Sequence, residues 1–270
     1  MNRLSISIVF YDTPIEIAAK MLSDLGIAVS NAHRKNLIGQ TSVVIVNNSQ
    51  EERVVNQLII KHANNDFSLR VLQNTNNIGF GAAHNQSILT QRSHYHLVLN
   101  PDAFLHKEAL SVAIDFLEKH PDIAMITPMG MNTNNQPVYL AKRFPSLLIL
   151  ALRGLSPTIG RRWFGERLSS YEYHDIGTEG HTEVLLASGC CMLCRTDILQ
   201  SVKGFDERFF LYFEDFDLSL RIKQLGKIAC LPAMVVVHSG GNASRKGFRH
   251  ILMFSMSMLR FFNRWGWRFL

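Results

Sequence analysis

Three acidic residues, Glu214, Asp215 and Asp217, follow a run of aromatic residues in the segment "GFDERFFLYFEDFDLSLR". Acidic residues are favoured in the first turn of a helix, so the three could form a charged helix start in water. The alternative is a carboxylate at the edge of the core, where partial loss of solvent suits it to act as a general base. A helix that begins near Asp215 is predicted to bury Leu218, Ile222 and Leu225.

A second pair of polar residues stands at the end of a predicted strand in "YHLVLNPDAFL". Asn100 and Asp102 flank Pro101, which restricts the backbone between them. Oxygen ligands at a strand end can meet a diphosphate and its divalent cation, since hard cations prefer oxygen. The same residues fit a simple Asn-Pro-Asp turn in which Asp102 caps the next segment.

Two further segments are weaker candidates for ligand contact. "NIGFGAAHN" places Gly79 and Gly81 at a predicted helix start, where free backbone N–H groups can face a ligand. It lacks the third glycine of the dinucleotide fingerprint, and a tight strand-to-helix turn explains the glycines equally well. His238 ends a predicted strand in "PAMVVVHSGG", a position that favours a ligand role although a lone His is more often structural.

Strands and helices alternate along the first half of the chain, and this order must position the polar residues. The patterns predict strands at 4–10, 42–48, 69–74 and 95–100, and helices at 12–26, 51–63, from about 82, and at 108–119. Thr13 and Glu16 form a capping-box pattern for the first helix, and Gly26 can end it. The alternation predicts an α/β fold with a mainly parallel sheet covered on both faces.

Polar or glycine-rich residues follow all four predicted strands. They stand at 11–12, 47–49, 76–81 and 100–102. In parallel sheets of this kind, ligands bind beyond the carboxyl ends of the strands. The pattern therefore suits a crevice for a nucleotide.

The regular alternation lapses after about residue 127, and long polar loops with Gly and Pro fill residues 131–183. Strand-like sequence resumes in "VLLASGCCMLC", which indicates a substrate-facing insertion and not a linker between domains. The chain is therefore predicted to form one domain with two functional halves, 1–127 and 128–244, and a tail at 245–270.

The basic charge is concentrated at one end of the chain. The net charge is +6, and residues 218–270 hold nine Lys and Arg residues and no Asp or Glu. The tail segment "GFRHILMFSMSMLRFFNRWGWRFL" can form a helix that lies on an anionic membrane surface or docks on the body, and the sequence favours neither. Basic residues interleaved with aromatic residues fit a lipid surface at least as well as nucleic acid, and no nucleic-acid partner is expected.

Cysteine usage and hydropathy bear on the cellular compartment. No run of 18 or more uncharged apolar residues occurs and no signal peptide is recognised, which favours a cytoplasmic protein with membrane contact open through 245–270. Cys190, Cys191, Cys194 and Cys230 are expected to be reduced and buried. Cys191 and Cys194 have the spacing of half a zinc site, but no convincing second pair exists.

Taken in order, these motifs resemble the family 2 glycosyltransferases of the GT-A fold, and within them the bacterial rhamnosyltransferase-like branch. The motifs are "SIVFYD", "VIVNNS", "NIGFGAAHN", "LNPDAFL", "KRFPS", "ASGCCMLCR", "GFDERFFLYFEDFDLSLR" and "PAMVVVHSGG". Each motif is modest, but the ordered set is specific. The resemblance covers about residues 5–245.

The resemblance implies an inverting transferase that moves a sugar, such as rhamnose from dTDP-rhamnose, from a nucleoside diphosphate donor to an acceptor hydroxyl. Residues 1–127 would form the nucleotide-sugar-binding half and residues 128–244 the acceptor and catalytic half. The acceptor would be a glycan or lipid-linked glycan in the assembly of a bacterial surface polysaccharide such as O-antigen.

The resemblance also implies roles for individual residues. Asp215 would be the general base, with Glu214 beside it and Asp217 as a first-turn acid. Asp102 and His238 would bind a divalent cation, Mg or Mn. The residues expected to contact the nucleotide sugar are Tyr11, Asp12, Asn47, Gly79, Asn100 and Asp102.

Two positions depart from the family pattern, because Asn47 and Asn100 stand where many members carry acids. The change at Asn47 bears on recognition of the nucleotide base, and the change at Asn100 leaves a metal site with fewer negative charges.

A competing function is a non-catalytic module that binds nucleotide sugars or anionic membranes, in which the tail is the functional part. A sugar nucleotidyltransferase is disfavoured, because "FYDTPIE" lacks a glycine-rich basic loop after the first strand.

Overall fold

The computed structural model of the chain describes residues 1–50, 66–155, 157–238 and 247–270, so the helix predicted at 51–63 lies outside the described residues. The strands are β1 (Asn2–Phe10), β2 (Ile38–Asn47), β3 (Ser68–Gln73), β4 (Tyr95–Leu99), β5 (Ala103–Leu105), β6 (Ile123–Met131), β7 (Pro137–Val138), β8 (Ala141–Lys142), β9 (Thr182–Glu183), β10 (Leu186–Ala187), β11 (Cys191–Arg195) and β12 (Lys227–His238). The helices are α1 (Ile15–Arg34), α3 (Phe80–Ile88), α4 (Ala109–Lys119), α5 (Leu147–Leu155), α6 (Pro157–Tyr171), α7 (Thr196–Ser201), α8 (Glu214–Ile222) and α9 (Phe248–Trp265).

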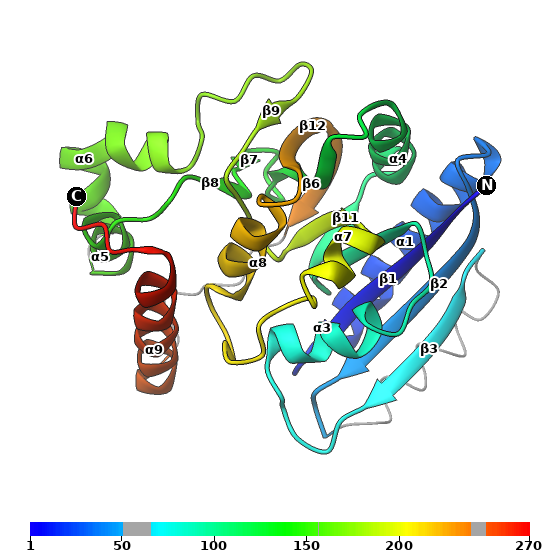
Figure 1. Cartoon of the computed structure of the whole chain (residues 1–270), viewed down its shortest axis with the longest axis horizontal. Helices are drawn as coiled ribbons and strands as arrows, with labels where there is room; N and C mark the ends of the chain where they lie inside the picture. Colours follow the sequence, from blue (N-terminus) through cyan, green and yellow to red (C-terminus); the bar gives the residue numbers. More distant parts are fainter. Residues whose placement is uncertain (51–65, 156, 239–246) are drawn as a thin grey trace.

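The central sheet is parallel in its first half and mixed in its second (Figure 1). The strand order is β3-β2-β1-β4-β11-β6-β12-β5. The pairs β3–β2, β2–β1 and β1–β4 are parallel, as is β6–β12, whereas β11 runs antiparallel to both of its neighbours. β5 is antiparallel to β12, and β8 and β10 form a separate two-stranded ribbon. The predicted α/β fold with a mainly parallel sheet is confirmed.

Helices cover both faces of this sheet. α1 and α4 pack on one face, and α3, α7 and α8 pack on the other. Leu97 and Val98 of β4 illustrate the division, because successive side chains of a strand point to opposite faces and these two belong to different core clusters. Each fully buried side chain of this size contributes about 1.5–3 kcal/mol to folding.

The first helix differs from the prediction at both ends. It begins after Pro14 without a side-chain cap, so the capping-box prediction for Thr13 is wrong. It also continues through Gly26, which is buried, as far as Arg34. Val29 and Ala32 extend the buried stripe, and their burial outweighs the cost of about 1 kcal/mol for a glycine inside a helix.

A chain of polar side chains runs through the core between β1, β4 and α3. Ser7 Oγ lies 2.7 Å from His84 Nδ1 and 2.8 Å from His96 Nε2, and Ser5 Oγ lies 2.7 Å from His96 Nδ1. Ser5 also contacts Ser93 Oγ at 2.7 Å. Both histidines are fully buried, and burial lowers the pKa of His96 to about 3 and the pKa of His84 well below its usual value. The two imidazoles are therefore neutral.

The C-terminal helix α9 lies with α5 and α6 at the end of the molecule opposite β3 (Figure 1). Phe261 and Phe262 are fully buried against an aromatic cluster that includes Phe209 and Phe213. The tail therefore docks on the body, which was one of the two alternatives. Its other face leaves four apolar side chains 46–60% exposed, at Ile251, Leu252, Met256 and Leu259.

Within the residues that the structure describes, none of the helices combines the length and apolar character needed to span a bilayer. All four cysteines are buried and unpaired, as predicted.

Candidate active site

Asp102 and His238 meet because β5 pairs with β12, with Ala103 opposite His238 in the register. His238 Nε2 lies 3.3 Å from Asp102 Oδ2. The interaction with Asp102 raises the pKa of His238 to about 10. Burial opposes ionisation of Asp102, but His238 outweighs it and lowers the pKa of that carboxyl. The pair is therefore ionic at neutral pH.

The backbone before α8 is held in an unusual conformation that places the next carboxylates. Tyr212 and Phe213 have φ values of 72° and 63°, in the left-handed region that non-glycine residues rarely adopt. Each costs about 1–3 kcal/mol, a strain that clusters at functional sites. The ring of Phe213 is buried, and this packing anchors the turn.

Glu214 and Asp215 occupy the first turn of α8 at the edge of the core. Asp215 accepts hydrogen bonds from the Gly189 N–H at 3.0 Å and the Phe216 N–H at 2.9 Å. Glu214 is 5% exposed, and its Oε2 has no hydrogen-bond partner among the described residues. Burial raises the pKa of both carboxyls, and the negative charge of Asp215 raises that of Glu214 further. A carboxyl pair with raised pKa values can take up a proton from a substrate and release it again, as general base catalysis requires.

Asp217 has a different environment, although it shares this first turn. Its side chain is fully buried and lies 2.8 Å from Arg221 and 3.0 Å from Arg264. It also accepts a hydrogen bond of 2.9 Å from the indole of Trp265. Asp217 therefore anchors α9 to α8. The same helix buries Leu218 and Ile222 as predicted, but it ends before Leu225, whose predicted burial is wrong because the residue is 55% exposed.

The loop at 188–190 connects the two acidic centres. Gly189 donates its N–H to Asp215, and the next residue, Cys190, accepts a hydrogen bond of 2.9 Å from the Asn100 N–H. The Cys190 thiol also contributes to the raised pKa of His238. The sequence alone predicts no role for Gly189. Its one distinguishing feature there is that it is a glycine inside the apolar run "ASGCC".

The residues at the ends of β1 and β2 differ in exposure. Tyr11 is 56% exposed, and Asp12 is exposed and donates its N–H to Ser49 Oγ at 2.8 Å. Asn47 is buried, donates to Gln73 Oε1 at 2.8 Å and accepts the Ser49 N–H at 3.1 Å. Tyr11 and Asp12 are thus open to a ligand, whereas Asn47 holds the strand ends together.

Gly79 is required by close backbone packing. Its φ is +91°, and a Cβ there would lie 2.5 Å from the carbonyl oxygen of Phe210. Its N–H donates to Asn77 Oδ1 at 2.9 Å, and its carbonyl accepts a hydrogen bond from Asn48. The expectation that this N–H is free to face a ligand is therefore wrong, and the tight-turn alternative describes the residue.

Lys142 belongs to the motif "KRFPS", for which the sequence alone predicts no chemical role. It is 9% exposed at the end of β8, and its Nζ lies 3.7 Å from Glu172 Oε1. Burial lowers its pKa to about 8. Its positive charge opposes the effect of burial on Asp215, since it lowers the pKa of that carboxyl.

One oxygen of Asp102 is available to a divalent cation. Asp102 Oδ1 is buried and has no hydrogen-bond partner among the described residues, so it can accept a metal. His238 uses its Nε2 toward Asp102, and no group of three His, Cys, Asp or Glu side chains forms a complete metal site in the described part of the chain.

The mixed central sheet with helices on both faces has the arrangement of the GT-A class of transferase folds. The family model for "Glycosyltransferase like family 2" matches residues 18–251, and the chain belongs to this family. The resemblance inferred from the ordered motifs is confirmed.

Two curated relatives are rhamnosyltransferases. The chain is 23% identical over 209 residues to N-acetylglucosaminyl-diphospho-decaprenol L-rhamnosyltransferase of Mycobacterium tuberculosis, a match that covers 73% of this chain and 66% of the relative. It is 24% identical over 214 residues to rhamnosyltransferase WbbL of Escherichia coli, covering 76% and 75%. The chain thus spans just under two thirds of the first relative's length.

Solved structures share the fold at low identity. TarS 1-349 of S. aureus, in complex with UDP-GlcNAc, superposes with a TM-score of 0.62 at 16% identity, covering 97% of this chain and 67% of that chain. The mannosyltransferase PcManGT of Pyrobaculum calidifontis, in complex with GDP-Man and Mn2+, gives 0.63 at 14% identity, covering 96% and 64%.

Proposed function

We propose that this protein transfers a sugar from a nucleoside diphosphate donor to an acceptor hydroxyl, with inversion at the anomeric carbon. The observation that carries the proposal is the 188–190 loop. Gly189 of this loop donates its N–H to the Asp215 carboxylate, and the carbonyl of the next residue, Cys190, accepts the N–H of Asn100, two residues before Asp102. A candidate base and a candidate diphosphate site therefore stand at opposite ends of one short loop.

Asp215 acts as the general base in this proposal. A sugar hydroxyl is a poor nucleophile, and it needs a proton acceptor as its oxygen bonds to the anomeric carbon. The two backbone N–H groups orient the Asp215 carboxylate, and burial keeps its pKa raised. Glu214 interacts electrostatically with Asp215. Its buried, unpartnered oxygen can accept a hydrogen bond from the acceptor sugar.

The departing diphosphate is stabilised at Asp102 and His238. The imidazolium of His238 contributes positive charge at this end of the site. Asp102 would hold a divalent cation, which would neutralise charge on the leaving group when bound. Tyr11 and Asp12, exposed just beyond the end of β1, are proposed to contact the base and ribose.

The donor sugar is proposed to be rhamnose, as the curated relatives are rhamnosyltransferases. The acceptor is proposed to be a lipid-linked glycan in the assembly of a bacterial surface polysaccharide. The printed name of the first relative, which describes an acceptor built on diphospho-decaprenol, supports this part of the proposal.

The test is a panel of nucleoside diphosphate sugars, assayed for binding and for nucleotide release with and without magnesium or manganese. Asp215→Asn is expected to lower turnover by about a hundredfold or more while donor affinity stays within about twofold. Asp197→Asn, at an exposed acid outside the site, is the matched control and should behave as the parent protein. Unchanged turnover in Asp215→Asn would remove Asp215 as the base and favour the non-catalytic binding module.

The outer face of α9 is proposed to contact the membrane surface. The exposed residues Leu252 and Met256 belong to its apolar stripe, and the segment from 218 onward carries no acidic residue to repel anionic lipids. The double variant Leu252→Ser/Met256→Ser should reduce flotation with phosphatidylglycerol vesicles, whereas Ile27→Ser, at an equally exposed position on α1, should not. Equal flotation of both variants would contradict this contact.

A further inference from the structure

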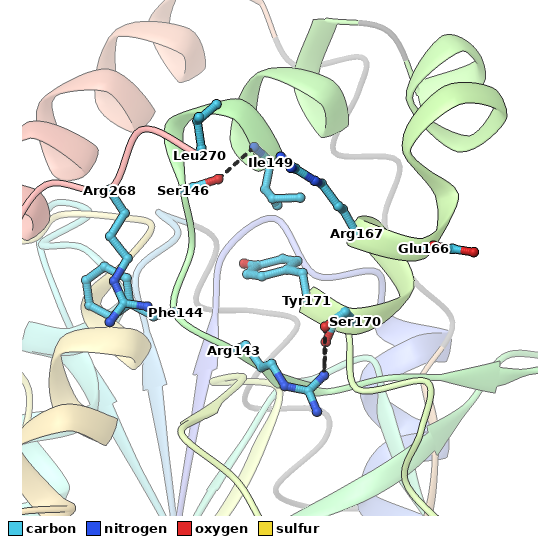
Figure 2. Close-up of a pocket in the computed structure, with 10 residues that line it drawn as sticks. All are labelled: Arg143, Phe144, Ser146, Ile149, Glu166, Arg167, Ser170, Tyr171, Arg268 and Leu270. Atoms are coloured by element: carbon cyan, nitrogen blue, oxygen red, sulfur yellow. Dashed lines mark hydrogen bonds between the residues drawn. The ribbon is translucent and has the colours of Figure 1, made fainter.

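A cavity lies between the segment after β8, α6 and the C-terminal residues. It has a volume of about 590 Å³. Its lining contains three guanidinium groups and one side-chain carboxylate, together with apolar and hydroxyl side chains and the C-terminal residue Leu270 (Figure 2). The lining residues used below are Arg143, Glu166, Arg167, Ser170, Tyr171 and Arg268.

The positive charge of this cavity is largely uncompensated. Arg143 is paired with Asp175 at 2.7 Å, but Arg167 and Arg268 form no ion pair with any described residue. Arg268 lies over the ring of Phe144, 4.3 Å from its centroid. Figure 2 shows the carboxylate of Glu166 pointing away from the other lining side chains. An anion that enters would meet two guanidinium groups with free donors.

A buried hydroxyl group also lacks a partner here. Tyr171 is 4% exposed, and its hydroxyl makes no hydrogen bond within the described part of the chain. In Figure 2 its ring lies in the middle of the lining residues, with the hydroxyl directed toward the side where Phe144 and Arg268 lie. A buried donor without a partner is costly, and a ligand oxygen would satisfy it.

The cavity adjoins the proposed base and an apolar edge. β8 ends one residue before Arg143 and pairs with β10 at Ala141–Ala187, and Gly189, two residues further on, donates its N–H to Asp215. The Arg143 N–H donates to the Tyr171 carbonyl at 2.9 Å. On the outer side, Phe269 and Leu270 are 66% and 84% exposed. A ligand bound here could present a hydroxyl to Asp215 at one end and an apolar chain to these residues at the other.

We propose that this cavity binds the diphosphate of an acceptor in which the sugar is joined to a prenyl chain, with Arg167, Arg268 and Tyr171 as the contacting residues. This inference rests on the proposed transferase function. The guanidinium groups match phosphate oxygens in geometry and charge, and the apolar edge suits the prenyl chain. Phosphate groups of membrane lipids share part of this chemistry, and the experiment separates the two sources.

The experiment measures binding of monodisperse farnesyl diphosphate by calorimetry and, separately, binding to phosphatidylglycerol vesicles. Arg167→Gln/Arg268→Gln is expected to lower affinity for farnesyl diphosphate by about tenfold or more, because each charge-assisted hydrogen bond to phosphate is strong. Arg167→Lys/Arg268→Lys should recover part of the lost affinity for farnesyl diphosphate, because lysine keeps the positive charge that attracts the phosphates. Arg92→Gln, at an exposed arginine outside the cavity, is the matched control and should leave affinity unchanged.

Donor binding and nucleotide release into water are measured on the same proteins. Retention of both in the double variant, with weaker farnesyl diphosphate binding and a raised acceptor KM, supports the proposal. Unchanged farnesyl diphosphate affinity in the double variant overturns it, as does a loss confined to vesicle binding, which would assign the cavity to lipid headgroups. Absence of donor binding in the parent protein would instead overturn the proposed transferase function.

Discussion

Acidification should destabilise this fold through the buried histidines of the core. His96 is fully buried between two serine hydroxyl groups, and its pKa of about 3 lies below the value of 6.5 expected in the unfolded chain. The unfolded chain therefore takes up a proton below about pH 6.5 that the folded chain does not. The stability that neutral His96 provides is complete above this pH and is lost as the pH falls toward 3.

The magnitude follows from the separation of the two pKa values. Each pH unit below about 6.5 costs about 1.4 kcal/mol for one such group, so a change from about pH 7 to pH 5 should cost about 2 kcal/mol through His96. Glu214 and Asp215 act in the opposite direction, because their raised pKa values favour the folded state as the pH falls. The contribution of His96 must therefore be measured as a difference between variants.

The assay is urea unfolding at both pH values for the parent protein and for His96→Gln, which removes the titration while keeping a polar side chain. The variant is expected to have a lower free energy of unfolding than the parent protein at both pH values. Its free energy of unfolding should fall by about 2 kcal/mol less than the parent's between about pH 7 and pH 5. His106→Gln, at an exposed histidine, is the control and should keep the parent's pH dependence. An identical pH dependence in the parent and His96→Gln would refute the assignment of His96 as a buried neutral group.

Three further predictions follow from the site. Asp217→Asn should lower the free energy of unfolding by about 3–5 kcal/mol in urea denaturation, because it leaves buried Arg221 without its counter-charge; a loss below about 1 kcal/mol would contradict this anchor. Lys142→Met should move the acidic limb of the kcat/KM profile to higher pH, since the lost ammonium no longer lowers the pKa of Asp215; an unmoved limb would show that the two groups do not interact. Gly79→Ala should cost about 1–3 kcal/mol by thermal or urea unfolding because of its positive φ and the nearby carbonyl, and a neutral effect would contradict the close packing.

The first half of the fold was predictable because local pattern and tertiary role agree there. The strands that became β1, β2 and β4 are buried over most of their length, and polar residues end or follow each of them. β3 is an edge strand without a fully buried side chain, and its alternating pattern identified it. Gly26 shows where this agreement fails, since its local preference favours a helix end but its position on the buried face of α1 keeps the helix intact. Leu225 failed for the opposite reason, because helical spacing predicts burial only while the helix continues.

The sequence predicts which residues are candidates for the site, but it does not predict how they contact one another in the fold. Strand ends and a helix start identified Asp102, His238 and Asp215 as candidates, and their roles remain predictions. The loop at 188–190 and Lys142 could not be found in this way, because their importance arises from contacts across the sheet and the β8–β10 ribbon. Only the pairing of strands distant in sequence brings Gly189 to Asp215.

The anchor formed by Asp217 ties the position of α9 to that of the proposed base. Asp215 and Asp217 stand two residues apart in one helical turn, and Trp265 and Arg264 bind the second of them directly. A surface that holds the outer face of α9 would therefore also set the distance between that surface and the Asp215 carboxylate. An acceptor tethered to the same surface would need only lateral diffusion to reach the site, and the length of its glycan would decide which hydroxyl arrives at the base.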